Sequence, residues 1–221
     1  MKFTFVKKQP EAKNITTFWF KPEKELSQIA GQYTELIIPH DNPDERKNRR
    51  WFTLSSSPTE RLASITTKLD PVRKSSFKTA LSGLKSGDII SGHMPMGDFV
   101  LPKDETLPLV FVAGGIGITP YRSILKYLLD TGQRRNITLI YSISAPDELA
   151  FADLIEKSGV EFIRHIGRLK AKDILAYIPV DNRQVVYISG PENMVETLQN
   201  DLIGLGVDKF QIRSDFFHNY D

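Results

Sequence analysis

The apolar pattern of this chain changes once, close to residue 103. Before that point, runs such as KFTFVKK (residues 2–8) and ITTFWFKP (15–22) alternate apolar and polar residues, as half-buried antiparallel strands do. After it, apolar segments such as PLVFVAG (108–114) are continuous and alternate with segments of helical period such as TPYRSILKYLLD (119–130). This change predicts an antiparallel β unit followed by an α/β unit with a parallel sheet.

Two groups of elements follow from these patterns. Seven β-rich runs supply the strands of a predicted six-stranded antiparallel barrel, at residues 2–8, 15–22, 33–39, 51–57, 64–69, 88–94 and 99–102, with one helix at 75–84. In the second half, strands are expected at 108–114, 137–143, 160–165, 185–190 and 209–217, and helices at 119–130, 147–157, 171–178 and 191–205. The prediction is a β-barrel domain at residues 1–102 and a doubly wound, parallel-sheet α/β domain at residues 108–221.

The composition narrows the classes of partner. Lys and Arg number 29 against 27 Asp and Glu, so the formal charge of +2 gives no electrostatic case for binding nucleic acid. The absence of cysteine excludes disulfides, thiolate-held iron–sulfur clusters and cysteine nucleophiles. We find no apolar stretch that fits a signal peptide or a membrane span, and the four histidines lack metal-ligand spacing. We therefore expect a cytoplasmic protein without a bound metal.

A glycine-rich turn joins the first strand and the first helix of the second half. In VFVAGGIGITP the glycines are Gly114, Gly115 and Gly117. Thr119 suits the N-cap of the following helix, and Pro120 suits its first position. Backbone N–H groups at such a turn and the helix dipole favour an anion such as a phosphate. Because the third glycine of the dinucleotide fingerprint is absent, a tight turn without a ligand stays an alternative.

A second turn of this kind follows a later strand. In ISGPENM, Ser189 and Gly190 end the strand and Pro191 opens a helix. The carboxyl ends of parallel strands meet at one edge of the sheet, where α/β folds bind ligands, so the two turns together predict a nucleotide crevice. Met194 is a candidate to flank the ligand, although a helical methionine is more often core filler.

The stretch RRWFTLSSSP combines cations, aromatic rings and hydroxyls within ten residues. On an extended strand, Arg50 and Phe52 lie on one face and Trp51 and Thr53 on the other. Arg50 can clamp a phosphate bidentately, Phe52 can pack on a flat ring, and Thr53 can hydrogen-bond a ring atom. The alternative is a barrel strand with aromatic core residues and solvent-facing hydroxyls.

These residues resemble a known family. Arg50–Ser56 resembles the R-x-Y-S/T-x-x-S flavin motif of the ferredoxin–NADP reductase superfamily. Further segments resemble this superfamily in the same order, and they cover nearly the whole chain: AGQY at 30–33, the turn at 84–99, the loops at 114–120 and 189–191, and DFFHNY at 215–220. The resemblance implies a flavin-binding barrel followed by an NAD(P)-binding α/β domain.

The resemblance also implies roles for individual residues. It assigns FAD contacts to Arg50, Trp51, Phe52, Thr53, Thr66, Thr67, Lys68, Ser75, Ser76, Phe217 and Tyr220. It assigns NADH or NADPH contacts to Gly114, Gly115, Gly117, Thr119, Pro120, Ser142, Gly190, Pro191 and Met194. The implied catalytic residues are Thr53, Ser189, Asp215 and Tyr220. Ser75 and Ser76, at the start of a helix, would hold the pyrophosphate, which agrees with the anion preference of a helix N-terminus.

Several positions depart from the family pattern. Phe52 stands where the family usually has tyrosine, so a hydroxyl contact is lost. Ser189 replaces a cysteine, and Asp215 replaces a glutamate that is one methylene longer. Tyr220 is the penultimate residue, and a frayed terminal residue is the alternative to a ring that covers the flavin.

The function implied by the resemblance is that of an NAD(P)H-dependent flavoprotein reductase. It would pass electrons from FAD to a separate acceptor such as ferredoxin, flavodoxin or an oxygenase component, and we expect a monomer. Two alternatives stay open: a reductase that uses free flavin as its substrate, and a non-catalytic nucleotide-binding electron-transfer subunit. Asp147 and Glu148 near Ser142 favour NADH slightly, whereas Arg122, Arg164 and Arg168 are candidates to reach a 2′-phosphate or are surface charges.

Overall fold

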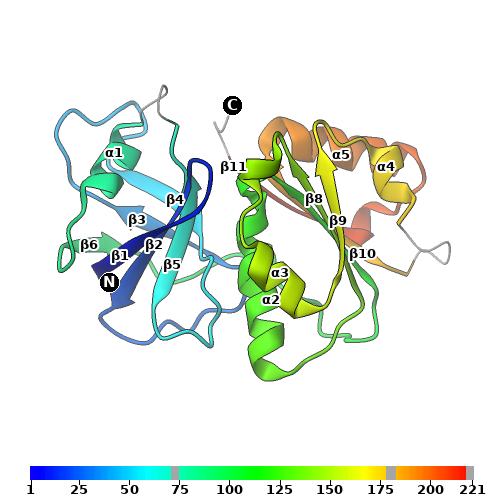
Figure 1. Ribbon diagram of the computed structural model, residues 1–221, viewed down its shortest axis with the longest axis horizontal. Coiled ribbons are helices and arrows are strands. Elements are labelled where there is room, and N and C mark those ends of the chain that lie inside the picture. Colours follow the sequence, from blue (N-terminus) through cyan, green and yellow to red (C-terminus); the bar gives the residue numbers. More distant parts are fainter. Residues whose placement is uncertain (71–74, 178–182, 218–221) are drawn as a thin grey trace.

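The structure is a computed structural model, and it describes residues 1–70, 75–177 and 183–217. Two sheets lie side by side in the molecule (Figure 1). The first is a six-stranded antiparallel sheet and the second a five-stranded parallel sheet, which confirms the predicted fold class.

The first sheet curls into a barrel. Its strands are β1 (Lys2–Ala12), β2 (Ile15–Pro22), β3 (Tyr33–Ile37), β4 (Arg49–Thr53), β5 (Ala63–Lys68) and β6 (Ile89–Gly92), in the order β4-β3-β6-β1-β2-β5. A bridge between Leu54 and Ile65 joins the two edges and closes the barrel. Alternate side chains point inward, so that the phenylalanines of β1 and β2 fill the core together with Phe77 of helix α1 (Ser76–Gly83).

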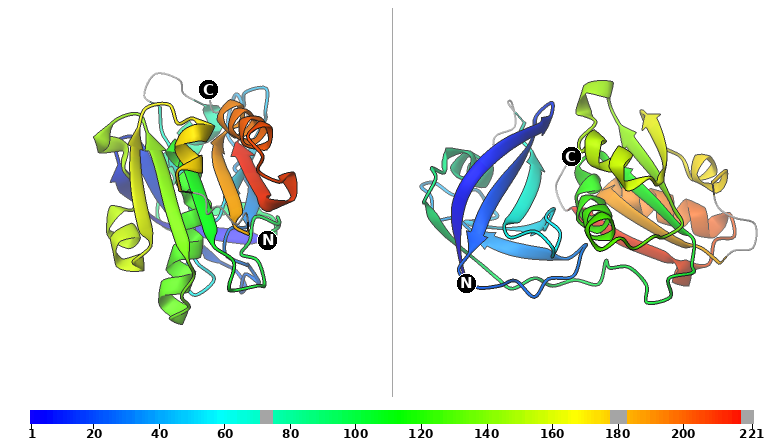
Figure 2. Two further views of the ribbon diagram at one scale, coloured as in Figure 1. Left: turned by 90° about the vertical axis from the view of Figure 1, so that its right-hand side faces the viewer. Right: turned by 60° about the horizontal axis from the view of Figure 1, so that its bottom comes forward.

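The second sheet is doubly wound. Its strands are β7 (Leu109–Gly114), β8 (Ile137–Ile143), β9 (Glu161–Ile166), β10 (Val185–Pro191) and β11 (Ile212–Phe217), in the order β11-β10-β7-β8-β9. The helices are α2 (Thr119–Thr131), α3 (Ala152–Ser158), α4 (Ala171–Leu175) and α5 (Glu192–Gly204). Because β7 alternates its side chains, Phe111 packs with α2 and α3 on one face, and Val112 packs with α4 and α5 on the other (Figure 2).

The segment FVLP was predicted to be a strand, and this prediction is wrong. Residues 99–102 form no strand; they run between the two sheets. Phe99 is buried there, with its ring 5.1 Å from that of Tyr187 and 5.8 Å from that of Tyr121. The Tyr187 hydroxyl donates to the Val100 carbonyl oxygen at 2.7 Å. The apolar character of this segment therefore serves packing between the barrel and the second sheet.

The helix predicted at 147–157 is divided into two. A short 3₁₀ turn, η2 (Pro146–Glu148), precedes α3, and Phe151 lies between them with φ +61°. This left-handed conformation breaks a continuous helix and directs the buried Ala150 into the core. The final predicted strand is also shorter than expected, because η3 (Lys209–Gln211) takes up its first residues.

Candidate active site between the two sheets

Three of the predicted catalytic residues converge where the barrel meets the second sheet. Thr53 is the last residue of β4, and Ser189 and Asp215 lie opposite each other on β10 and β11. The Ser189 hydroxyl donates to a carboxylate oxygen of Asp215 at 3.4 Å, and Thr53 also hydrogen-bonds this carboxylate. Strand β4, which carries the flavin-like motif, thus touches β11, the neighbour of the strand that carries the second nucleotide-like turn. Tyr220 lies outside the described residues.

The carboxyl group of Asp215 is held in a poorly hydrated place. Burial raises its pKa to about 6, against the opposing effect of the hydrogen bonds from Ser189 and Thr53, and the charge of Asp98 raises it further. Thr53 and Ser189 are both buried. A carboxyl group with this pKa exchanges a proton close to neutral pH, which suits acid–base work.

Arg50 is enclosed by the loop before β4. Its Nη1 donates to the carbonyl oxygens of Arg46, Lys47 and Arg49 at 2.7, 3.0 and 2.7 Å, and its Nη2 donates to the Asp44 carboxylate. A bidentate clamp on a phosphate would require these contacts to break. The Nε donor of Arg50 has no partner and is buried, in a side chain that is only 9% exposed.

The start of helix α1 lies beside this arginine. The Ser76 hydroxyl accepts from the Asp44 backbone N–H at 2.9 Å, and the Ser75 hydroxyl donates weakly to the Asp44 carboxylate at 3.4 Å. The Phe77 ring lies 5.7 Å from the ring of Phe52 and 5.4 Å from the Arg50 guanidinium. An orphaned buried N–H beside a helix N-terminus with two serines fits a phosphate group, so these residues suit the phosphate end of a flavin.

The other residues assigned to the flavin differ in exposure. Trp51 is 52% exposed and packs edge-on against Tyr33, at 5.4 Å between ring centroids. Thr66 is buried, and its hydroxyl donates to the Ser55 hydroxyl at 2.9 Å. Lys68 forms an ion pair of 2.7 Å with Glu148 of the second half. Thr67 is fully buried, and the side chain of Phe217 lies outside what the structure describes.

The two glycine turns of the second sheet pack directly on each other. A methyl group added to Gly117 would lie 2.0 Å from the Ser189 carbonyl oxygen, so a glycine is required for the first loop to rest on β10. A methyl group on Gly114 would lie 2.2 Å from the Met194 sulfur. Gly115, by contrast, has φ +52° and open space beside it. Backbone N–H groups next to open space are what an approaching pyrophosphate needs.

Thr119 does not cap helix α2, so that prediction is wrong. A 3₁₀ turn, η1 (Gly115–Ile118), intervenes between β7 and α2, and Ile118 occupies the N-cap. The Thr119 hydroxyl donates to the Ile116 carbonyl oxygen at 3.1 Å, within this turn. Pro120 follows within the first two helical positions, close to its predicted place. The insertion of η1 moves the helix start by one residue.

The second turn and its neighbour are also occupied by internal contacts. Pro191 is the N-cap of α5. A methyl group added to Gly190 would lie 3.3 Å from the Met194 sulfur. The Ser142 hydroxyl donates to the Gly167 carbonyl oxygen at 2.8 Å and so supports the turn after β9. Met194 therefore packs beside both glycine turns, at the carboxyl ends of β7 and β10.

Sequence reasoning missed the contacts that join α2 to the loop after β4. Arg122 donates from Nη2 to Glu60 at 3.0 Å and from Nη1 to the Ser55 carbonyl oxygen at 3.0 Å. The Ser123 hydroxyl donates to the Ser56 carbonyl oxygen at 2.6 Å. Arg122 had been a candidate to reach a 2′-phosphate or to be a surface charge; its side chain is only 12% exposed and is paired with Glu60, so it is not a surface charge. Residues this distant in sequence carry no local signal of such a pairing.

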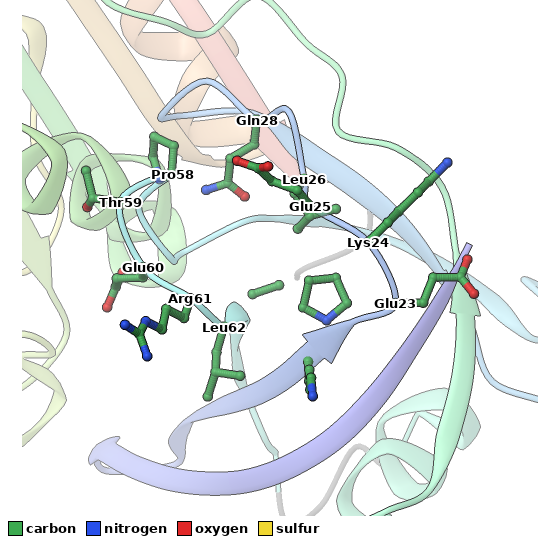
Figure 3. Close-up of a pocket in the computed structure, with 13 residues that line it drawn as sticks. Glu23, Lys24, Glu25, Leu26, Gln28, Pro58, Thr59, Glu60, Arg61 and Leu62 are labelled. Carbon is green, nitrogen blue, oxygen red and sulfur yellow. The ribbon is translucent and has the colours of Figure 1, made fainter.

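A cavity of about 490 Å³ lies on the barrel (Figure 3). Its lining consists of Lys21, Pro22, Glu23, Lys24, Glu25, Leu26, Gln28, Pro58, Thr59, Glu60, Arg61, Leu62 and Ala63. It contains none of the predicted site residues. Across residues 1–70, 75–177 and 183–217, no group of acidic or histidine side chains is arranged to hold a metal ion, and no helix is long and apolar enough to cross a membrane.

Comparison with known proteins agrees with this geometry. Residues 111–162 match the family model of the oxidoreductase NAD-binding domain. A flavohemoprotein of Bacillus cereus is 29% identical over 97% of this chain and 60% of its own length, and flavohemoprotein A of Dictyostelium discoideum is 28% identical over 97% and 59%. The chain thus spans about 60% of the length of these curated relatives.

Solved structures share the whole fold. The flavohem-like FAD/NAD-binding domain of nitric oxide dioxygenase from Vibrio cholerae has a TM-score of 0.80 at 24% identity, covering 98% of both chains. The Amycolatopsis cytochrome P450 reductase GcoB has a TM-score of 0.82 at 21% identity, over 98% of this chain and 70% of that one. The chain therefore shares the fold of these FAD- and NAD-binding reductases, and residues 111–162 match the oxidoreductase NAD-binding domain.

Proposed function

We propose that this chain is a flavoprotein reductase that transfers hydride from NAD(P)H to FAD and passes the electrons to a separate redox protein. One observation carries the proposal: Thr53 of β4 and Ser189 of β10 meet at the buried carboxyl group of Asp215. A hydride donor held at β10 and an acceptor held at β4 would therefore lie next to each other. The match to an oxidoreductase NAD-binding domain and the shared fold of an FAD/NAD-binding domain support FAD and a pyridine nucleotide as the two ligands.

The residues of the barrel would bind and orient the flavin. Arg50 offers its unpaired Nε to a phosphate, and Ser75 and Ser76 offer hydroxyls at the start of α1. Thr53 offers a hydroxyl at the end of the same strand. When bound, FAD would accept a hydride and release electrons singly or in pairs, which no side chain of this protein can do.

The second sheet would bind the pyridine nucleotide. The backbone N–H groups of Gly115 to Ile118 would hold its pyrophosphate at the end of β7, and Gly117 brings this loop against Ser189. Asp215, with a pKa of about 6, would hold or release a proton beside Thr53. Asp147 and Glu148 are already paired with Lys13 and Lys68, so the preference for NADH rests on the absence of an arginine next to Ser142.

The electron acceptor would be a separate protein. A chain without cysteine carries no thiolate-held iron–sulfur cluster of its own. Its neighbours in structure include a cytochrome P450 reductase and phthalate dioxygenase reductase, a modular structure for electron transfer from pyridine nucleotides to [2Fe-2S]. We also propose that the protein is a cytoplasmic monomer with a flavin-binding domain at residues 1–102 and an NAD(P)-binding domain at residues 108–221.

A reductase that uses free flavin as a substrate is the second candidate. It is favoured by the contacts of Arg50, because a guanidinium that already donates to four oxygen atoms of its own loop has little left for tight binding of a phosphate. In this case flavin would bind and leave during each turnover. The residues that orient the ring would be the same.

Visible absorbance of the purified chain, before and after anaerobic addition of NADH or NADPH, tests the proposal. We expect flavin bands that bleach, and the nucleotide that bleaches them faster is the donor. Turnover of added flavin without bands in the purified chain would favour the free-flavin reductase. If the chain binds nucleotide but reduces neither bound flavin nor added flavin, the result would contradict both reductase functions and indicate a non-catalytic subunit.

A further inference from the structure

We propose that Asp44 determines the flavin specificity of this chain: its carboxylate, bound to Arg50, admits a singly charged phosphate of the FAD pyrophosphate and disfavours the doubly charged phosphate monoester of FMN. This inference rests on the proposed function, because it assumes that a flavin phosphate binds beside Arg50. It assigns a role to a residue outside the flavin-like motif, in the loop that precedes it.

Asp44 lies where two elements meet. Its carboxylate accepts from Nη2 of Arg50 on β4, from the Arg46 backbone N–H at 3.1 Å, and weakly from the Ser75 hydroxyl at 3.4 Å. Its own backbone N–H donates to the Ser76 hydroxyl at 2.9 Å. The groups that suit a phosphate, namely one arginine and two serines of a helix start, therefore already surround an anion of the protein.

The donors of Arg50 show what is left for a ligand. A guanidinium has five N–H donors in a fixed plane. Those on Nη1 and Nη2 are directed at three backbone carbonyl oxygens and at Asp44. The Nε donor is buried and has no partner. A phosphate that binds here can thus use the Nε donor, and it meets an arginine whose charge is balanced by a carboxylate.

The other ionisable groups around this pair are few. Among the described residues, His40 contacts it indirectly, through Nε2 at 3.0 Å from the Ser76 hydroxyl. The side chains of Arg46, Lys47 and Arg49 are exposed, so their charges are screened by solvent. Burial tends to raise the pKa of Asp44, but the hydrogen bonds from Arg50 and Ser76 outweigh it and keep the pKa below its usual value. Asp44 therefore stays ionised near neutral pH.

Because the charge of Arg50 is balanced by Asp44, FAD and FMN should bind with different affinities. Each phosphate of FAD is an ester that an anhydride bond joins to the other, and it carries one charge, whereas the phosphate of FMN is a monoester with a second pKa of about 6 and carries nearly two charges above neutrality. The second charge would face the Asp44 carboxylate, and among the described residues the cation that contacts this carboxylate, Arg50, is already balanced by it. Repulsion between unit charges a few Å apart near a protein surface corresponds to about tenfold in affinity or more.

The variant Asp44→Asn tests this role, with Asp41→Asn as its matched control. Asp41 is an exposed carboxylate of the same loop, so its variant loses the same charge away from Arg50. Flavin fluorescence is titrated with the full chain for FAD and for FMN. We expect wild type and Asp41→Asn to prefer FAD, and Asp44→Asn to bind FMN about tenfold more tightly with FAD affinity changed by less than about threefold.

The wild-type chain gives a second measurement that needs no variant. The ratio of FMN affinity to FAD affinity should fall as the pH rises through about 6, because only FMN gains a charge there. In Asp44→Asn the ratio should stay level or rise with pH.

The outcomes separate this inference from the proposed function. An equal loss of both flavins in Asp44→Asn would mean that Asp44 only holds Arg50 in place, and it would overturn the inference while flavin binding by wild type stands. An FMN-to-FAD ratio that is independent of pH in wild type would also overturn it. Failure of the wild-type chain to bind either flavin would instead contradict the proposed function itself.

Discussion

The most unusual single group in this protein is the carboxyl of Asp215. Its pKa is raised to about 6 by burial, whereas in an unfolded chain it would titrate near the ordinary value of 3.8. Between these two values the folded state binds more protons than the unfolded state, so the contribution of Asp215 to stability falls as the pH rises from about 4 to about 6. Above pH 6 the buried charge is a full cost to folding.

We expect Asp215→Asn to stabilise the protein at pH 7.5 by roughly 1–3 kcal/mol and to change stability little at pH 4, since one pKa unit corresponds to about 1.4 kcal/mol. Asparagine keeps an oxygen that can accept from Ser189 and Thr53. Denaturant unfolding at the two pH values measures the effect, and reduction of flavin by NADH in the same variant should be slower. A variant that is less stable at pH 7.5 would contradict the buried, charged state.

Substitution by alanine should have different effects at Gly115 and at Gly117, the two glycines of the loop after β7. Gly117→Ala places a methyl group 2.0 Å from the Ser189 carbonyl oxygen, so the loop and β10 must separate. Gly115→Ala meets open space and costs only the strain of φ +52°, about 1 kcal/mol. We expect Gly117→Ala to abolish nucleotide binding and Gly115→Ala to retain stability within about 1–2 kcal/mol. Binding of NADH and unfolding of both variants provide the comparison, and equal behaviour would refute the packing argument.

At the scale of elements, periodicity was sufficient for the core strands and for most helices. The alternating runs at 2–8 and 15–22 are strands β1 and β2, and the continuous run at 108–114 is the central strand β7. Strand order and pairing needed the structure, because edge closure between Leu54 and Ile65 depends on contacts that no local pattern encodes. The motif residues Thr53, Ser189 and Asp215 were named from the sequence, but their convergence was not.

The errors have a common physical origin. FVLP has the composition of a strand, yet its phenylalanine packs between the barrel and the second sheet, on Tyr187 and Tyr121. Phe151 interrupts a helix of good local propensity because its left-handed backbone serves the tertiary packing of its neighbours. Tertiary contacts overrode local propensity in both segments.

The connection between the sheets should therefore depend on Phe99 rather than on backbone pairing. We expect Phe99→Ala to lower the free energy of unfolding by about 3 kcal/mol, since it empties a buried ring site. Val100→Ala, at a partly buried neighbouring position, should cost under about 1.5 kcal/mol. Denaturant unfolding monitors both, and similar costs for the two variants would show that the ring contributes no special contact.

On the scale of the whole molecule, the two halves are held together by a polar clasp formed by Arg122, Ser123, Glu60 and the carbonyl oxygens of Ser55 and Ser56. Helix α2 follows directly from the nucleotide-like loop, and residues 54–60 follow directly from β4. The clasp therefore fixes the candidate nucleotide site relative to the candidate flavin site. Hydride transfer requires reacting atoms at about 3–3.5 Å, so small displacements between the halves should slow it strongly.

The ion pair at the centre of this clasp can be dissected by a double-mutant cycle. The side chains of Arg122 and Glu60 are only 12% and 18% exposed, so Arg122→Gln or Glu60→Gln leaves one mostly buried charge unpaired and should cost about 3 kcal/mol. The double variant should recover part of this cost, because no charge is left unpaired. Lys126→Gln is the control: its pair with Asp130 is more exposed and lies within α2, and its loss should cost under about 1 kcal/mol.

The same variants separate stability from alignment of the two halves. If the clasp aligns the halves, Arg122→Gln should lower kcat for flavin reduction by about tenfold or more while flavin affinity and the KM for NADH change little, since neither binding surface contains Arg122. Lys126→Gln should keep the wild-type kcat. Stopped-flow reduction at saturating NADH, with deuterated NADH to confirm that hydride transfer is the slow step, measures this. A kcat unchanged in Arg122→Gln, at a temperature where the variant is folded, would show that the clasp serves stability alone and that the barrel and the second sheet are aligned by the contacts of Phe99 and Asp215.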